Sequence, residues 1–310
     1  MHPIDIAVVK LLCATFQSYM TYMGKLSAIL KLTRIEHSFM LVIAVFSAEL
    51  IAKGIPDPIA LIASFITPIF ISMASFAIND YYDIAVDKAN RNMKRPLVSG
   101  ELSKCDALYV TYICLAIGIF ASMLINSYAY YIAVIFGALA MLYSYRLKQI
   151  ILLGNIYIAF SMAIPFIYGN YVVSSSLSPA IILISAMIFL SGLGREIHGT
   201  VRDMRGDRLR GVTSLPRAIS RTGASVIALL LYFAAIGISI YLFVYMVPFK
   251  GDAVYLVLIG IADMLLVYVS LAYLNKKTQK FYRLARNASL AAMLLALIAI
   301  LAAPLTYALL

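Results

Sequence analysis

Charged residues are scarce in this chain. Asp, Glu, Lys and Arg make up 13% of the 310 residues, 63% are hydrophobic, and the mean hydropathy is +0.94. A soluble globular domain carries about 25% charged residues, so the composition excludes that class and is typical of an integral membrane protein. The long apolar segments lack the strict alternation of barrel strands, so we expect them to be helices.

Cysteine is scarce too. The chain has only Cys13, Cys105 and Cys114, whose spacing fits no metal site and whose odd number prevents complete pairing. We expect them to be small apolar fillers. The sequence also lacks low-complexity segments and linkers. We therefore predict a single domain over residues 1–310, in which 1–33 is a cytoplasmic or interfacial segment rather than a signal peptide.

Nine apolar segments of about 17 to 27 residues are each long enough to cross a membrane with some tilt. The fold class that they predict is an all-α polytopic membrane protein. The predicted transmembrane helices lie near residues 35–54, 57–80, 105–125, 128–146, 150–173, 178–200, 222–248, 253–274 and 287–309.

Acidic residues are fewer than basic ones, 14 against 25, which gives a net charge of +11. In a soluble protein this excess would indicate nucleic acid, but in a membrane protein the positive-inside rule explains it. Of the basic residues, 23 of 25 fall on one predicted side and only Lys53 and Lys250 on the other. We predict a multi-pass cell-membrane protein among membrane lipids, without a nucleic-acid partner. Its N-terminus would be cytoplasmic and its C-terminus outside.

Five of the 14 acids form two clusters on the predicted cytoplasmic side. The first is Asn79-Asp80-Tyr-Tyr-Asp83-Ile-Ala-Val-Asp87, and the second is Asp203-Met-Arg-Gly-Asp207, about 120 residues later. Each follows a predicted helix, and these two helices run in the same direction because they are four apart. On a helix, Asn79, Asp83 and Asp87 share one face, whereas Asp80 points elsewhere. Such oxygen ligands suit Mg²⁺.

Basic residues accompany both clusters. Arg91, Lys94 and Arg95 follow the first, and arginines surround the second. Carboxylates beside cations fit a metal–phosphate site, because the metal joins carboxylate to phosphate and the basic groups take the remaining charge. The alternative is a solvated loop whose charges pair with one another. For the second cluster alone, a salt-bridged positive-inside loop explains the residues equally well.

With these motifs the chain resembles the UbiA superfamily of intramembrane prenyltransferases, which has nine transmembrane helices. The first cluster and Arg95-Pro96-Leu97-Val98-Ser99-Gly100 look like its first signature. Asp203-x-x-x-Asp207 and Thr213-Ser214-Leu215-Pro216 look like its second. The resemblance implies one Mg²⁺ on Asn79 and Asp83 with support from Asp87, and a second on Asp203 and Asp207. It also implies that the catalytic residues are Asp83, Asp87, Asp203 and Asp207.

The resemblance further implies that basic residues bind the donor's diphosphate. Arg95 is the preferred candidate, because a planar guanidinium grips phosphate oxygens in pairs. Lys94 is next to it, and Arg34 precedes the first predicted helix. Lys148 follows Tyr143-Ser144 in a segment that resembles a diphosphate-binding connection of the family. A positive-inside anchor is an equally good interpretation of Lys148.

The implied function is Mg²⁺-dependent transfer of a polyprenyl group from its diphosphate to a lipid or aromatic acceptor. Arg195-Glu196-Ile197 followed by Asp203-x-x-Gly206-Asp207 is similar to the archaeal branch that makes digeranylgeranylglyceryl phosphate. That branch uses geranylgeranylglyceryl phosphate as acceptor. Arg34-Ile-Glu36-His37-Ser38 is similar to branches that prenylate aromatic acids such as 4-hydroxybenzoate. A transporter would concentrate polar groups near the midplane, whereas here only Asp263 is charged well inside a span.

Overall fold

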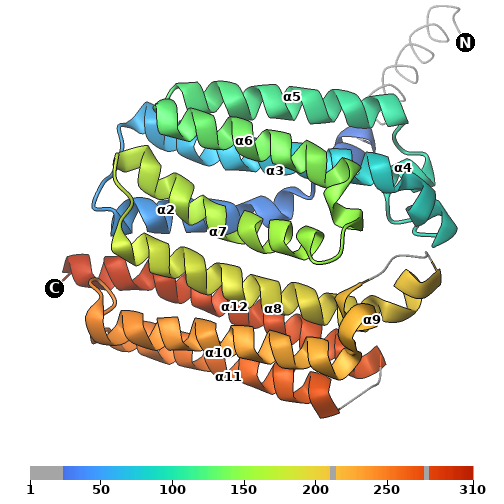
Figure 1. Ribbon diagram of the computed structural model, residues 1–310. Coiled ribbons are helices and arrows are strands. Elements are labelled where there is room, and N and C mark those ends of the chain that lie inside the picture. The colour runs from blue at the N-terminus through green and yellow to red at the C-terminus, as the bar shows by residue number, and fades with distance from the viewer. Residues whose placement is uncertain (1–23, 210–213, 276–278, 310) are drawn as a thin grey trace, which may run out of the picture.

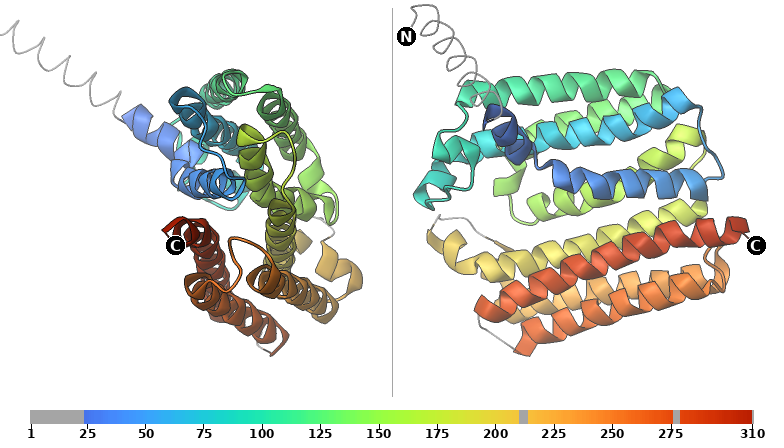
Figure 2. Two further views of the ribbon diagram at one scale, coloured as in Figure 1. Left: turned by 90° about the vertical axis from the view of Figure 1, so that its left-hand side faces the viewer. Right: turned by 180° about the vertical axis from the view of Figure 1, so that it is seen from behind.

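The structure is a computed structural model that describes residues 24–209, 214–275 and 279–309, without the side chains of 205–209 and 279–280. Every regular element within these residues is a helix, so the all-α prediction is confirmed. The long helices lie side by side in two groups (Figure 1), which the end-on view in Figure 2 also separates. The predicted segment 1–33 is described only from residue 24, and residues 24–33 are helical.

Five long helices form the first group and four form the second. The first group holds α2 (Ser38–Ile51), α3 (Pro58–Ala89), α5 (Lys104–Met123), α6 (Ser127–Tyr145) and α7 (Leu153–Val173). The second holds α8 (Pro179–Leu209), α10 (Arg221–Tyr245), α11 (Ala253–Asn275) and α12 (Gln279–Leu309). The groups join where α7 packs against α8 and where α2 packs against α12.

Four short helices complete the described chain. They are η1 (Ile35–His37), α4 (Pro96–Ser99), η2 (Leu147–Gln149) and α9 (Leu215–Ile219). The α4 turn begins with Pro96 and ends at Gly100, whose φ of 85° favours glycine. In Figure 1, α4 and α9 lie at the same end of the bundle.

Eight of the described helices are long and apolar enough to cross a membrane, which makes the protein a multi-pass membrane protein. All nine predicted helices are present, but the first is shorter than predicted. Arg34 has left-handed backbone angles (φ 49°), which separate helical residues 24–33 from η1, and α2 then has only 14 residues. At about 1.5 Å per residue, α2 is shorter than the ~30 Å hydrocarbon core.

Three helices extend well beyond their predicted ends. The prediction ended two of them at residues 80 and 200, but α3 continues to Ala89 and α8 to Leu209. Helix α12 begins at Gln279, before the predicted start at 287. Hydropathy marks where a helix leaves the lipid, whereas backbone hydrogen bonding continues through polar residues. Both acidic clusters therefore lie on helices, and Figure 1 shows the C-terminal ends of α3 and α8 at the same end of the bundle, as predicted.

Small residues set the spacing of the helices that carry the site. A Cβ atom at Gly169 of α7 would lie 2.5 Å from the Val45 carbonyl oxygen of α2. A Cβ atom at Gly194 of α8 would lie 2.9 Å from the Tyr232 ring of α10. Without a side chain at either position, the helices approach closely, as is common in membrane bundles. The start of α3 is fixed by Asp57, which accepts hydrogen bonds from the backbone of Ile59 and Ala60.

Candidate active site

Lys148 joins the first acidic cluster from outside α3. Its Nζ atom donates to Asp83 Oδ1 at 2.6 Å and lies 3.4 Å from Asn79 Oδ1. Asn79 in turn donates through Nδ2 to Asp83 Oδ2 at 3.0 Å, which confirms that these two residues share a helix face. Lys148 belongs to η2, so the fold brings it 65 residues along the chain to Asp83. The fold therefore places this lysine against the first cluster.

Asp87 continues the same stripe of α3 one turn further on. Its carboxylate accepts from Asn92 Nδ2 at 3.4 Å and forms an ion pair with Arg95 Nε at 3.6 Å. Arg95 precedes the α4 turn, so the Pro96 start of that turn directs the guanidinium back toward α3. The cluster thus has cations on two sides.

Asp80 has a different position from the other three residues. Its side chain is 1% exposed and lies between two guanidinium groups, Arg34 at 2.7 Å and Arg95 at 3.0 Å. Arg34 also lies over the Phe76 ring, 4.5 Å from its centroid. Burial lowers the pKa of Arg34, while the charge of Asp80 opposes that shift. Asp80 therefore holds two arginines in place, in agreement with the prediction that it points away from the metal-ligand face.

Lys94 is the one predicted diphosphate ligand for which the described residues provide no neighbour of opposite charge. Its side chain is exposed, and no described carboxylate forms an ion pair with it. Asp263, the acid inside α11, accepts a hydrogen bond from Ser239 Oγ at 2.7 Å. It serves to link α10 and α11 rather than to join either cluster.

On α8, the described acids Glu196 and Asp203 each pair with the arginine that precedes them in the sequence. Arg195 Nη1 donates to Glu196 at 2.9 Å, and Arg202 holds Asp203 with two bonds of 2.8 and 2.6 Å. The Asp203 side chain is 54% exposed. Asp207 lies on α8 as predicted, but its side chain is outside the described residues.

Tyr143 of α6 lies in the region between Asp83 and Glu196. Its ring stacks on Tyr157 of α7 with centroids 4.5 Å apart, which fixes its position. Helix α8 packs mainly on α7 and α10, so it does not touch α3 extensively. The clusters thus share one end of the bundle, on opposite helix groups.

The described carboxylates of both clusters pair with arginines or with Lys148 and do not gather around one point. Among the described residues, no three His, Cys, Asp or Glu side chains form a group that could hold a metal ion. The donor set nevertheless fits Mg²⁺, because Asn79, Asp83 and Asp87 offer hard oxygen ligands on one face. Asp83 is partly exposed beside a lysine that can pair instead with an added anion.

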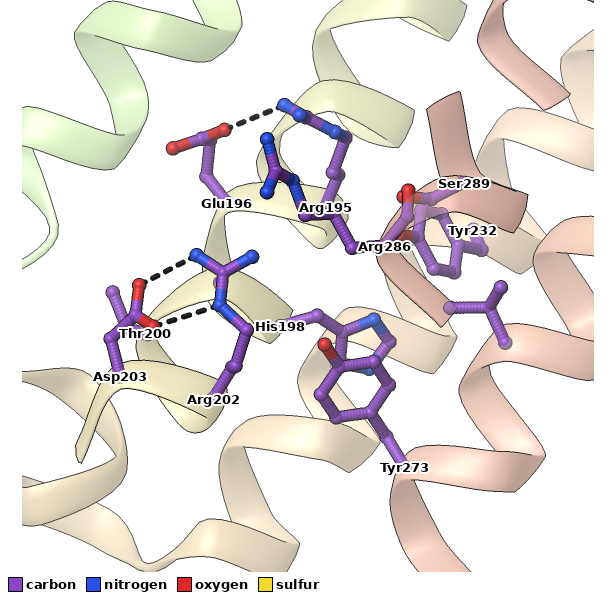
Figure 3. A pocket seen from close by; sticks show the side chains of 12 residues that line it. Arg195, Glu196, His198, Thr200, Arg202, Asp203, Tyr232, Tyr273, Arg286 and Ser289 are labelled. Atoms are coloured by element: carbon purple, nitrogen blue, oxygen red, sulfur yellow. Dashed lines mark hydrogen bonds and ion pairs between the residues drawn. The ribbon is translucent and has the colours of Figure 1, made fainter. Parts of the chain in front are cut away.

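A cavity of about 340 Å³ lies beside the second cluster, between α8, α10, α11 and α12 (Figure 3). Tyr232, Tyr273 and Arg286 line it from three helices. No motif marked these residues in the sequence, since each is a single polar group in or near an apolar run. For Arg286, the one available signal was a basic residue immediately before the predicted apolar segment 287–309.

The protein has membrane-spanning helices, and one end of the bundle carries two acidic clusters and several basic side chains. These are the features of an integral membrane enzyme whose substrate has an anionic head. The UbiA prenyltransferase family model matches residues 40–291. The chain is also 36% identical to digeranylgeranylglyceryl phosphate synthase of Archaeoglobus fulgidus over 277 residues, which is 88% of this chain and 94% of the relative. The chain therefore belongs to the UbiA prenyltransferase family, and it is a prenyltransferase.

Solved structures show the same fold. A structure from work on digeranylgeranylglyceryl phosphate synthase in membranes superimposes with a TM-score of 0.75 at 26% identity, covering 91% of this chain and 99% of the other. A UbiA homologue from Archaeoglobus fulgidus bound to GPP and Mg²⁺ gives a TM-score of 0.61 at 19% identity, with coverage of 89% and 99%.

Proposed function

We propose that this enzyme transfers a geranylgeranyl group from its diphosphate to geranylgeranylglyceryl phosphate, with Mg²⁺ as cofactor, in archaeal ether-lipid synthesis. The observation that carries the proposal is the convergence of Arg34, Arg95 and Lys148 on the acids of α3 at one end of a membrane bundle. The likeness to the Archaeoglobus fulgidus synthase, which spans most of both chains, supports the acceptor class.

The proposed metal ligands are Asn79, Asp83 and Asp87 on α3, with Asp203 and Asp207 on α8. When bound, Mg²⁺ would neutralise the charge that develops on the departing diphosphate. The related structure that holds GPP and Mg²⁺ supports this cofactor. Asp83 and Asp203 are the acids best placed to bind the metal, because the cation that each pairs with can bind an anionic ligand instead.

The chain's own cations would bind the diphosphate. Arg95 contacts both Asp80 and Asp87, so these two acids hold its planar guanidinium group beside the metal-ligand face of α3. Arg34 is fixed by Asp80 and Phe76 in the same way. Lys148 would exchange its contact with Asp83 for a phosphate oxygen. Because these groups are already in position before the substrate binds, less free energy is needed to reorganise them when the diphosphate leaves.

The reaction balances as a substitution at the allylic carbon. The donor's C–O bond breaks and diphosphate leaves with the electron pair. The free hydroxyl oxygen of the acceptor forms the new ether bond to that carbon and releases its proton. The charged head would lie at the end of the bundle that carries α4 and α9, and the apolar tail would lie among the helices or in lipid.

We also propose that this end faces the cytoplasm, because the positive-inside rule puts nearly all basic residues there. Replacement of Ser99 by cysteine tests the orientation, since Ser99 belongs to α4. We expect a membrane-impermeant thiol reagent to label it only after the membrane is opened, in a background without the native cysteines. Labelling in intact cells would reverse the proposed topology.

The direct test of function is incubation of the purified enzyme with geranylgeranyl diphosphate, Mg²⁺ and a panel of acceptors, with mass spectrometry of the products. We expect digeranylgeranylglyceryl phosphate from geranylgeranylglyceryl phosphate and no product in excess chelator. Product formed only from 4-hydroxybenzoate would overturn the acceptor class. Full turnover in chelator would overturn the role of the metal.

A further inference from the structure

The cavity beside the second cluster contains several buried polar groups that have no partner among the described residues. His198 is 2% exposed, and neither ring nitrogen has a hydrogen-bond partner. The Tyr232 hydroxyl and the Arg195 Nε atom are also buried without a partner. Buried polar groups are nearly always hydrogen-bonded, so several unpartnered groups in one cavity indicate a ligand.

Most of the groups around the cavity are donors, and the balance of charge is positive. Arg195, Arg202 and Arg286 line the cavity, against the two acids Glu196 and Asp203. Those acids pair with Arg195 and Arg202, so Arg286 has no described carboxylate partner. Guanidinium and hydroxyl donors favour an anion with several oxygens and disfavour a metal cation.

Stacked rings form one wall of the cavity, and its volume limits the ligand that can enter. The His198 ring stacks flat on Tyr273, with centroids 4.1 Å apart and 9° between the planes. Figure 3 shows Glu196 and Asp203 toward one side of α8, and His198, Tyr232 and Tyr273 toward the other. The volume of about 340 Å³ is near the lower end of the usual range for ligand pockets, about 300–1,000 Å³. It suits a small polar head group rather than a long prenyl chain.

We infer that this cavity binds the phosphate monoester of the lipid acceptor, through Arg286, Tyr232 and the arginines of α8. The inference rests on the proposed function, because it assigns the head group of that acceptor. A phosphate monoester carries nearly two negative charges and three acceptor oxygens, which match the donors better than the single charge of an aromatic carboxylate.

The position of the cavity agrees with the proposed reaction. Asp203 lines the cavity and is also a proposed ligand of the metal. Glycerol has three carbons, so the acceptor's free hydroxyl is at most two carbons from its phosphate. A phosphate held in this cavity would therefore keep the hydroxyl near the cavity, which Glu196 and Asp203 also line.

Arg286→Gln is the most informative variant, because no described acid loses its partner. At saturating donor, we expect the KM for geranylgeranylglyceryl phosphate to rise at least tenfold, with an unchanged KM for the donor. Arg283→Gln is the matched control, since Arg283 lies one turn earlier on α12, is exposed as Arg286 is, and does not line the cavity. Arg286→Lys should recover part of the loss. An unchanged acceptor KM, or equal rises for donor and acceptor, would overturn the inference.

Direct binding separates this inference from the proposed function. We would measure binding of a dialkylglycerol phosphate and of inorganic phosphate to the full-length enzyme in lipid nanodiscs, without donor. We expect the wild type to bind the lipid phosphate more tightly than Arg286→Gln does, even if the enzyme uses another acceptor. Equal binding in both proteins overturns the pocket assignment whatever the turnover, and equal affinity for inorganic phosphate overturns its assignment to a lipid.

Tyr232→Phe tests whether the cavity holds a ligand or only water. Without ligand, removal of a buried hydroxyl that lacks a partner should raise the melting temperature or leave it unchanged. With the lipid phosphate present, the same variant should bind several-fold more weakly than the wild type. A gain in stability with unchanged lipid affinity would show a cavity that holds only water, and would overturn the inference.

Discussion

The two acidic clusters are built in different ways. On α3, each acid is neutralised by a cation from elsewhere in the chain: Lys148 is 65 residues from Asp83, and Arg34 is 46 residues from Asp80. On α8, Glu196 and Asp203 each pair with the arginine immediately before them. The first cluster is therefore fixed by tertiary structure, whereas the second is formed by local sequence.

Because of this difference, we expect the first cluster to contribute more to the stability of the fold and the second to exchange its ion-pair partners more easily. Asp80 is 1% exposed between two arginines, so its charge cannot lose them without cost. Asp203 is 54% exposed, and its partner Arg202 lies on the same helix. We infer that the α3 cluster is the rigid half of the site and the α8 cluster the adaptable half, which suits an acid that must exchange an arginine for a metal.

The largest expected effect is on turnover and is common to both halves. Asp83→Asn and Asp203→Asn should each reduce the rate of product formation by about 10²–10³-fold or more, because each removes a charge that the leaving-group site requires. Single-turnover assays measure this loss, and size-exclusion chromatography confirms that the fold is kept. Wild-type rates in both variants would show that neither cluster takes part in the reaction.

The next largest expected effect is on the free energy of unfolding, which should differ between variants of the α3 cluster and of the α8 cluster. Asp80→Asn removes the acid that pairs with Arg34 and leaves Arg95 with Asp87 alone, so we expect a loss of about 1–3 kcal/mol in the free energy of unfolding. Asp203→Asn, the matched exposed change, should cost less than about 1 kcal/mol. Denaturant titration in mild detergent compares the two. Equal losses would remove the distinction between a rigid and an adaptable cluster.

Lys148→Met should separate donor binding from metal binding. Loss of this charge-assisted contact should raise the KM for the prenyl diphosphate about tenfold. The Mg²⁺ concentration for half-maximal rate should fall, because Asp83 no longer has a competing cation. Arg146→Met is the control, since Arg146 is exposed and forms no described ion pair. An unchanged donor KM together with an unchanged Mg²⁺ requirement in Lys148→Met would place the lysine outside the metal and donor site.

The smallest effect is expected at the surface contact between Lys31 and Glu101, where both side chains are well exposed. Hydrogen bonds from Ser99 and Lys31 lower the pKa of Glu101. The contact therefore stabilises the fold at a pH above the ordinary glutamate pKa, and this contribution is lost as the pH falls through the lowered value. Glu101→Gln should leave the melting temperature at neutral pH nearly unchanged. A clear fall there would show that this contact anchors α4.

Hydropathy and helical spacing predicted most of the fold. Nine helices, their order and the shared direction of α3 and α8 are present in the structure. Helix lengths were less well predicted, because α2 is short and α3 and α8 continue into their acidic ends. The spacing of Asn79, Asp83 and Asp87 correctly separated them from Asp80, since a helix fixes the angle between side chains whatever surrounds it.

The sequence by itself determined which kind of ligand this chain can bind and that its helices lie in lipid. Local spacing is enough to place acids on one helix face, and composition is enough to place a helix in the membrane. Only the tertiary structure decided which cation meets which acid. Lys148 and Arg34 reach α3 across long stretches of chain, and Arg286 lines the same cavity as the α8 arginines only because α12 packs in the same helix group. Such pairings depend on how helices pack in three dimensions, and no local pattern records that packing.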